Sequence, residues 1–273
     1  MWKAIKSEKQ LQVAIFLFVL LTVWWVLLYL SGSKESFPNY LFGATYGVMA
    51  LVGGIYGLYT ANKWGLTKSI MGKAILLLSL GLLAEEFGQI VFSYYNLFVN
   101  VPIPYPSLAD VGFFGNIPFY IGGAFYLAHA SGVQFSIQKI SGKIQAVVLP
   151  LLMLLAAYVL FLRDYDFTVS TPLKIFLDFG YPFGQALYVS MALLIYSLSK
   201  KILGGIMRDK IFFILVAFIL QFLSDYNFLY QASNGTWLNG GYGDYLYLLS
   251  YFFMTVGIIQ LGIVINRLKG DNG

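Results

Sequence analysis

The stretch that decides the fold is Ile75-Leu-Leu-Leu-Ser-Leu-Gly-Leu-Leu-Ala-Glu-Glu-Phe-Gly-Gln89, an apolar run that carries two adjacent acids, Glu85 and Glu86. It belongs to a hydrophobic segment long enough to cross a bilayer core of about 30 Å. A carboxylate within hydrocarbon is costly, so it normally faces the protein interior or a wet cavity, and a functional role is its default hypothesis. The stretch therefore predicts a membrane helix that contributes to a polar chamber.

The whole chain has the composition of a membrane protein. Of its 273 residues, 59% are hydrophobic and 11% are charged, and the mean hydropathy is +0.75. Soluble domains average about 25% charged residues. The apolar runs lack the period-two alternation of a membrane barrel, so we expect helices alone. Cysteine is absent, which excludes disulfides and thiolate chemistry, and the single His129 argues against zinc sites built from several histidines.

We expect an all-α integral membrane protein with eight transmembrane helices. Their predicted ranges are about 11–30, 39–61, 70–97, 108–131, 144–163, 171–199, 209–232 and 242–267. The first follows three lysines and resembles a signal peptide, but it is longer than a usual signal-peptide core and no small-residue cleavage site follows it. We therefore expect this helix to be retained.

The basic residues predict the orientation of these helices, because cytoplasmic segments carry an excess of lysine and arginine. One set of connections and ends holds Lys3, Lys6, Lys9, Lys63, Lys68, Lys73, Lys139, Lys143, Lys200, Lys201, Arg208, Lys210, Arg267 and Lys269. The opposite set holds Lys34, Arg163 and Lys174. We therefore expect both termini in the cytoplasm and the protein in the plasma membrane. The net charge of +5 then reports topology, and nucleic-acid binding is not needed to explain it.

The two halves of the chain resemble each other in register. Glu86-Phe87 in the third predicted helix parallels Asp225-Tyr226 in the seventh, and Asp110 opens the fourth helix much as Asp244 opens the eighth. Because each unit has an even number of helices, both copies cross the membrane in the same orientation. Many transporters instead contain inverted repeats. We therefore predict two parallel four-helix repeats, residues 1–135 and 136–273.

The acidic residues of the spans all fall toward the predicted outer side. Glu86 lies 13 residues beyond Lys73 and Asp225 lies 15 beyond Lys210, roughly 20 Å and 22 Å along a helix that rises 1.5 Å per residue. Asp178, Asp110 and Asp244 lie near the outer starts of their helices, and no lysine or arginine is expected at comparable depth. The acids therefore predict an outward-facing acidic pocket.

Helical spacing adds polar partners to these acids. Gln89 follows Glu86 at i+3, and Tyr181 and Gln185 follow Asp178 at i+3 and i+7. Gln221 precedes Asp225 by one turn, and Tyr247 and Tyr251 share a face with Asp244. Each stripe occupies one side of its helix, as expected when polar groups turn away from lipid. The predicted ligand-binding residues are Glu86, Asp178, Asp225, Asp110, Asp244, Gln89, Tyr181 and Gln185.

Structural roles compete with binding at several of these positions. Asp110 ends Ser107-Leu-Ala-Asp, an S-x-x-D pattern that caps helix starts, and Asp244 follows Gly243 in a similar setting. Glu86 and Asp225 could act as protonated hydrogen-bond donors between helices. Glu85 and Glu86 are about 100° apart on a helix, so at most one points fully into the pocket. Most tyrosines suit an interfacial aromatic belt.

A resemblance to a known class of region accompanies these patterns. Pro106-Ser-Leu-Ala-Asp110, followed by Pro118, is similar to the P-S-x-A-D…Y-P signature of a multi-helix membrane region at the N-termini of bacterial diguanylate cyclases and related signalling proteins. Ile117 replaces the tyrosine that usually precedes the proline. The resemblance implies a sensory or input role. The chain ends at Gly273, shortly after the eighth predicted helix. We therefore expect either a stand-alone relative that works through a partner or a protein from which an output domain has been removed.

Three classes of function remain open. The first is a receptor-like sensor that takes a small cationic or polar ligand from the outer side and signals to a cytoplasmic or membrane partner. The second is a proton- or cation-coupled carrier, and the third is an intramembrane enzyme that uses paired carboxylates. We find no metalloprotease motif, nucleophile elbow or phosphate-binding loop, which disfavours catalysis. We expect no catalytic residues and no cofactor, and the sequence does not decide whether metal binds.

Overall fold

The computed structural model describes residues 9–32, 34–101, 103–131, 140–159, 163, 165, 167–168, 170–199 and 208–270. Within these ranges all the regular structure is helical, with no β-strand, so the all-α prediction is confirmed. The elements are α2 (Lys9–Ser31), α3 (Phe37–Thr45), α4 (Val48–Lys63), η1 (Leu66–Lys68), α5 (Ile70–Tyr94), η2 (Tyr95–Val99), α6 (Ala109–Ala130), α8 (Ile140–Ala157), α9 (Pro172–Ser199), α10 (Arg208–Ser233) and α11 (Tyr242–Gly270).

The α3 and α4 helices together form the second predicted span. Only Tyr46 and Gly47 separate them, and both keep right-handed helical backbone angles. The side-chain amide of Gln89 donates to the Gly43 carbonyl oxygen at 2.7 Å. This bond gives a backbone carbonyl near the junction of α3 and α4 a hydrogen-bond partner. A side chain that inserts into the backbone ladder is a common cause of a helix irregularity.

Six helical segments of the described chain are long and apolar enough to cross a membrane. They are Lys9–Ser31, Phe37–Lys63, Ile70–Val99, Ala109–Ala130, Lys210–Ser233 and Tyr242–Asn266. The chain is therefore a multi-pass membrane protein. The two other predicted spans correspond to α8, whose apolar part is the shorter Lys143–Ala156, and to α9, Pro172–Ser199.

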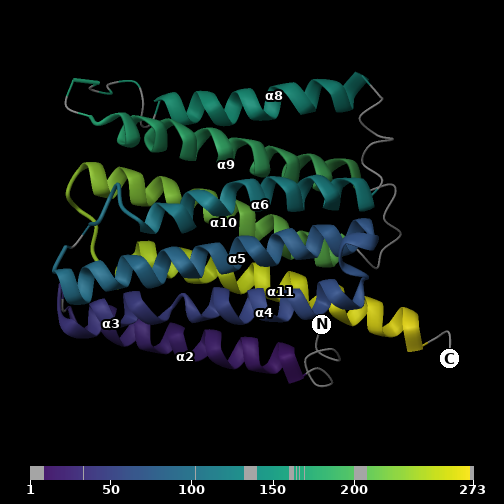
Figure 1. Ribbon diagram of the computed structural model, residues 1–273, viewed down its shortest axis with the longest axis horizontal. Helices are drawn as coiled ribbons and strands as arrows, with labels where there is room; N and C mark the ends of the chain where they lie inside the picture. Colours follow the sequence, from purple (N-terminus) through teal and green to yellow (C-terminus); the bar gives the residue numbers. More distant parts are fainter. Residues whose placement is uncertain are drawn as a thin grey trace.

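The helices lie side by side, with α2 and α8 at opposite edges of the bundle (Figure 1). The α5 helix packs against α4 and α6, while α10 packs against α9 and α11. These two groups meet where α11 contacts α4 and where α6 contacts α9. The fourth helix of each predicted unit thus packs on the second helix of the other, and the duplication itself stays a prediction. The predicted boundary at 135/136 lies outside the described residues.

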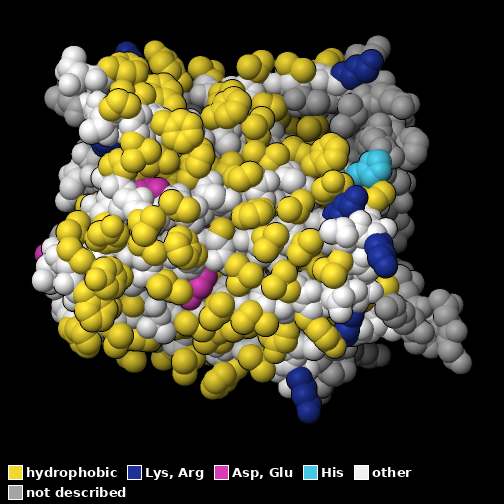
Figure 2. All heavy atoms as spheres, viewed as in Figure 1, with side chains coloured by type: hydrophobic (Ala, Val, Ile, Leu, Met, Phe, Trp, Pro, Cys, Tyr) yellow, Lys and Arg dark blue, Asp and Glu magenta, His cyan; other side chains and the backbone are white. Residues whose placement is uncertain are grey.

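The two ends of the bundle differ in charge. The connections before α6 and before α11 lie at one end, at the left in Figure 1, which we call the loop end. Lysine and arginine side chains gather mainly at the opposite end, and hydrophobic side chains cover the face between (Figure 2). Lys63, Lys68 and Lys73 belong to that opposite end, where α4 ends and α5 begins. Of the other basic residues in the orientation prediction, Lys3, Lys6, Lys139, Lys200 and Lys201 lie outside the described residues.

A close contact between two helices involves glycines of α5 and α6. A Cβ atom on Gly112 of α6 would clash with the backbone of Gly88 and Ala84 on α5. Small residues let membrane helices approach closely, and van der Waals packing between them then contributes to association. The contact fixes α6, and with it the start of that helix at the loop end, against the acid-bearing α5.

We expect Gly112→Ala to lower stability by about 1–3 kcal/mol, because the added methyl group meets backbone atoms that cannot turn aside. Gly115→Ala on the same helix is the matched control, since nothing lies within 4 Å of its added carbon. Thermal unfolding in nanodiscs measures both variants. Equal melting temperatures for the two would contradict the close contact between α5 and α6.

Candidate functional site

Glu85 lies at the centre of a buried hydrogen-bond network. Its side chain is 1% exposed. Its Oε1 accepts hydrogen bonds from Asn116 Nδ2 on α6 and, at 2.8 Å, from Gln221 Nε2 on α10. Its Oε2 accepts a third, at 3.1 Å, from the Tyr251 hydroxyl on α11. One carboxylate of α5 therefore joins three other helices, which between them come from both halves of the chain.

Asp225 on α10 is the second carboxylate of this network. Gln185 Nε2 on α9 donates to its Oδ2 at 2.7 Å, and the Tyr247 hydroxyl on α11 donates to its Oδ1 at 2.7 Å. Gln221 Nε2, which also serves Glu85, donates to Asp225 Oδ2 at 3.2 Å. The Gln221 amide nitrogen thus bridges Glu85, 136 residues earlier in the sequence, and Asp225, 4 residues later.

The donors to this pair of acids are neutral amides and hydroxyls. Among the described residues no lysine or arginine forms an ion pair with Glu85 or Asp225. Unscreened like charges repel strongly in a low-dielectric interior, and burying either charge carries its own desolvation cost. The arrangement can therefore hold or release positive charge, as a proton or a small cation, inside the bundle.

Glu86, the acid that the sequence analysis favoured, lies outside this pair. Its Oε2 lies against Gly47, at the junction of α3 and α4, where an added Cβ would clash with it. That oxygen is buried and has no hydrogen-bond partner among the described residues. Of the two adjacent acids, Glu85 is the one that joins Asp225. Gln89, one turn further along α5, instead holds α3: it bonds to the Gly43 carbonyl and accepts from the Tyr46 hydroxyl at 2.9 Å.

Asp110 and Asp244 fasten the connections that precede α6 and α11. Asp110 Oδ2 accepts from the Ser107 backbone N–H at 2.7 Å, and Asp244 Oδ2 accepts from the Gly240 backbone N–H at 2.6 Å. These are capping interactions, as one of the structural interpretations predicted. Asp110 Oδ1 also accepts from the Tyr181 hydroxyl of α9 at 2.8 Å, so this acid links its loop to the second half of the chain.

A chamber beneath the two loop-end connections brings most of these groups together. Five of the eight predicted site residues line it: Gln89, Asp110, Tyr181, Asp225 and Asp244. Pro104, Tyr105 and Trp237 come from the connections that cover it. The space open to the centre of a water molecule is about 40 Å³. A water needs about 10–15 Å³ on this measure, so the chamber accommodates a few waters or a comparably small ligand.

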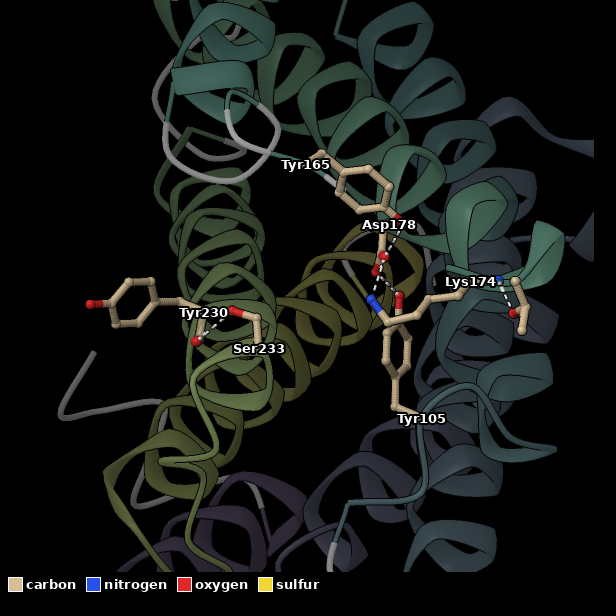
Figure 3. Close-up of polar contacts among 7 residues, drawn as sticks. Tyr105, Tyr165, Lys174, Asp178, Tyr230 and Ser233 are labelled. Carbon is tan, nitrogen blue, oxygen red and sulfur yellow. Dashed lines mark hydrogen bonds and ion pairs between the residues drawn. The ribbon is translucent and has the colours of Figure 1, made fainter. Parts of the chain in front are cut away.

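Asp178, which the sequence analysis grouped with Glu86 and Asp225, belongs to a different cavity. Its Oδ1 accepts from the Tyr105 hydroxyl at 2.5 Å, and its Oδ2 accepts from the Tyr165 hydroxyl at 2.7 Å and from Lys174 Nζ at 2.8 Å (Figure 3). The expectation that no basic residue lies near the acids is therefore wrong at this position. Lys174 sits one helical turn before Asp178 on α9, so the two side chains share a face.

Burial raises the pKa of the Tyr105 hydroxyl far above its ordinary value, and the bonded Asp178 carboxylate raises it further. Burial and Asp178 likewise raise the pKa of the Tyr165 hydroxyl. Both hydroxyls therefore stay protonated and donate at neutral pH. Tyr105 and Leu229 line this second cavity and the acidic chamber alike, so the two spaces share a wall.

Sequence reasoning missed four members of the network: Glu85, Asn116, Gln221 as a bridge, and Tyr251 as a donor to an acid. Gln221 and Tyr251 did appear in polar stripes, but which acid each one bonds to depends on how the helices are rotated. The helical spacing of Glu85 and Glu86 showed that only one could point inward. Asn116, the amide in the apolar middle of α6, is the signal that could have identified the facing helix.

Comparisons of the chain with protein-family models, with curated proteins and with solved structures find no match.

We expect Gln221→Leu to destabilise the protein by about 1–3 kcal/mol, because it leaves Glu85 and Asp225 each short of a buried hydrogen-bond donor. Gln231→Leu, on the same helix near the loop end, loses bonds to Asn227 and to the exposed Tyr242 hydroxyl that water can replace, so stability should change by less than about 0.5 kcal/mol. Thermal unfolding in nanodiscs compares the two. A Gln221→Leu variant as stable as Gln231→Leu would show that the bridging amide carries no stabilisation.

Proposed function

We propose that the protein is a receptor-like membrane sensor whose acidic chamber reads a proton, a small cation or a small polar molecule. The lysine distribution supports an orientation with the loop end outside and both termini in the cytoplasm of a plasma-membrane protein. The P-S-x-A-D resemblance supports a sensory role, with the signal passed to a membrane or cytoplasmic partner. Two parallel four-helix repeats would place one acid-bearing helix from each unit at the chamber.

The observation that carries the proposal is the connectivity of Glu85. Its three hydrogen bonds reach α6, α10 and α11, and Gln221 extends the network to Asp225 and so to α9. Together the bonds of the two acids join five helices, so a change of charge at either acid alters several of these interhelical bonds at once. A ligand that binds one arrangement better than another shifts their populations, which is the requirement for a sensor.

A proton- or cation-coupled carrier is the second candidate, because paired intramembrane carboxylates also suit ion transport. A carrier needs a route to the opposite end of the bundle. At that end, one cavity of the described chain lies near Lys63 and Asn266, and it leaves about 10 Å³ for the centre of a water molecule. That space is at the lower limit for a single water, so the geometry favours a chamber that opens at one end.

We expect the thermal stability of the wild type in nanodiscs to change between pH 5 and pH 8 or with added Na⁺ or K⁺, because anything that binds only the folded state stabilises it. Glu85→Gln and Asp225→Asn should each abolish that response while the protein stays folded. Asp178→Asn removes an acid outside the chamber and should preserve it. A response that survives both Glu85→Gln and Asp225→Asn rules out these two carboxylates as the sensing groups.

A flux measurement separates the sensor from the carrier. In proteoliposomes that hold a pH or Na⁺ gradient, a sensor should leave the leak of protons and Na⁺ at the rate of protein-free vesicles. Transport that depends on Glu85 and Asp225 would overturn the sensor proposal in favour of the carrier.

A further inference from the structure

The second cavity contains a cation held in a ligand-like position. Lys174 Nζ lies 2.8 Å from Asp178 Oδ2, and it lies 5.8 Å and 5.7 Å from the ring centroids of Tyr105 and Tyr165. A carboxylate with aromatic rings within about 6 Å is how proteins commonly bind ammonium groups. Figure 3 shows both tyrosines and Lys174 converging on Asp178 from different segments of the chain.

We propose that the cavity beside Asp178 binds a primary ammonium ligand, and that the Lys174 ammonium occupies the position of that ligand when none is present. This site is separate from the acidic chamber, and the proposal stands whether or not the chamber is a sensor. The ligand would donate to Asp178 and lie between Tyr105 and Tyr165, displacing Lys174 toward solvent.

The cavity has the size for such a ligand. The space open to the centre of a water molecule is about 270 Å³, compared with about 40 Å³ in the acidic chamber. Leu229, Ala232 and Ser233 of α10 form the wall opposite Asp178. Leu229 and Ala232 offer an apolar surface to the hydrocarbon part of an amine, and Ser233 adds one hydroxyl to this wall.

The Lys174 side chain is more exposed and more mobile than the Asp178 side chain, so a ligand ammonium group can replace Lys174 while Asp178 stays in place. The Asp178 side chain is 10% exposed and stays bonded to two tyrosine hydroxyls when Lys174 leaves. The Lys174 side chain is 37% exposed, at the end of a flexible four-carbon stem. An ion pair of this exposure contributes little to stability. Its order, lysine before the acid at i,i+4, is also the less favourable one on a helix.

The test measures binding of n-butylamine, which reproduces the end of a lysine side chain, by thermal shift in nanodiscs at neutral pH. Lys174→Met removes the internal ammonium but keeps an apolar stem. We expect this variant to be stabilised by n-butylamine at concentrations about tenfold lower than the wild type requires, because the internal competitor is gone. Lys174→Arg keeps a cation at the site and should respond as the wild type does.

Three controls make the result specific. Adding Asp178→Asn to Lys174→Met should abolish the shift, and 1-butanol, the neutral counterpart of the amine, should produce none. Lys63→Met is the matched lysine control. Lys63 Nζ also lies over a tyrosine ring, at 4.5 Å from Tyr59, and it donates to the Asn266 amide oxygen at 2.9 Å. This variant should gain no affinity for the amine.

Four outcomes would overturn the proposal: no n-butylamine shift in a folded Lys174→Met protein, an equal shift with 1-butanol, a shift that persists in the Asp178→Asn background, or an equal gain in Lys63→Met. Circular dichroism before heating establishes that each variant is folded. Lys174→Met leaves Asp178 two hydroxyl donors, so we expect it to pass that check.

Discussion

A carboxylate buried within a membrane helix bundle must find its hydrogen-bond donors inside the protein, and Glu85 finds three of them on three different helices. This requirement places Asn116, Gln221 and Tyr251 at one depth and on facing sides of α6, α10 and α11. It also explains why α5 and α6 approach through glycines, since a wider separation would draw the Asn116 amide away from its acceptor. The need to pair buried polar groups therefore helps to fix how the helices are rotated at the centre of the bundle. Apolar packing alone would be less selective about that rotation.

The acids that the sequence presents as one group are Glu86, Asp178, Asp225, Asp110 and Asp244, and the structure does not bring them to one site. Glu86 lies apart, against Gly47. Glu85 and Asp225 form the interhelical network, Asp110 and Asp244 hold the loop-end connections, and Asp178 pairs with Lys174 in a cavity of its own. The second cavity and the chamber meet at Tyr105 and Leu229. A ligand that displaces Lys174 would change the surroundings of Tyr105, and so one wall of the chamber. The fold thus provides a physical connection between the two sites.

The sequence predicted the helices well, because the length and continuity of apolar runs depend on local composition. Each predicted span corresponds to α2, to α3 with α4, or to one of α5, α6, α8, α9, α10 and α11. Polar stripes likewise placed Asp225, Tyr247 and Gln221 on inward faces. The choice between Glu85 and Glu86 could not be made this way, because it depends on the rotation of α5 against its neighbours. The Lys174–Asp178 pair was missed because each residue was placed only by its depth along the helix. The lysine side chain is long enough to reach an acid one helical turn away.

We expect the acidic chamber to open at the loop end of the bundle alone. The chain contains no cysteine, so Phe228→Cys places a unique thiol in the chamber wall. The measurement is the rate at which Ag⁺, a thiol-reactive cation small enough for a chamber that holds a few waters, reacts with this cysteine from each side of oriented liposomes. We expect labelling from the side of the loop end alone. Labelling from the opposite side, or from neither side, would contradict it.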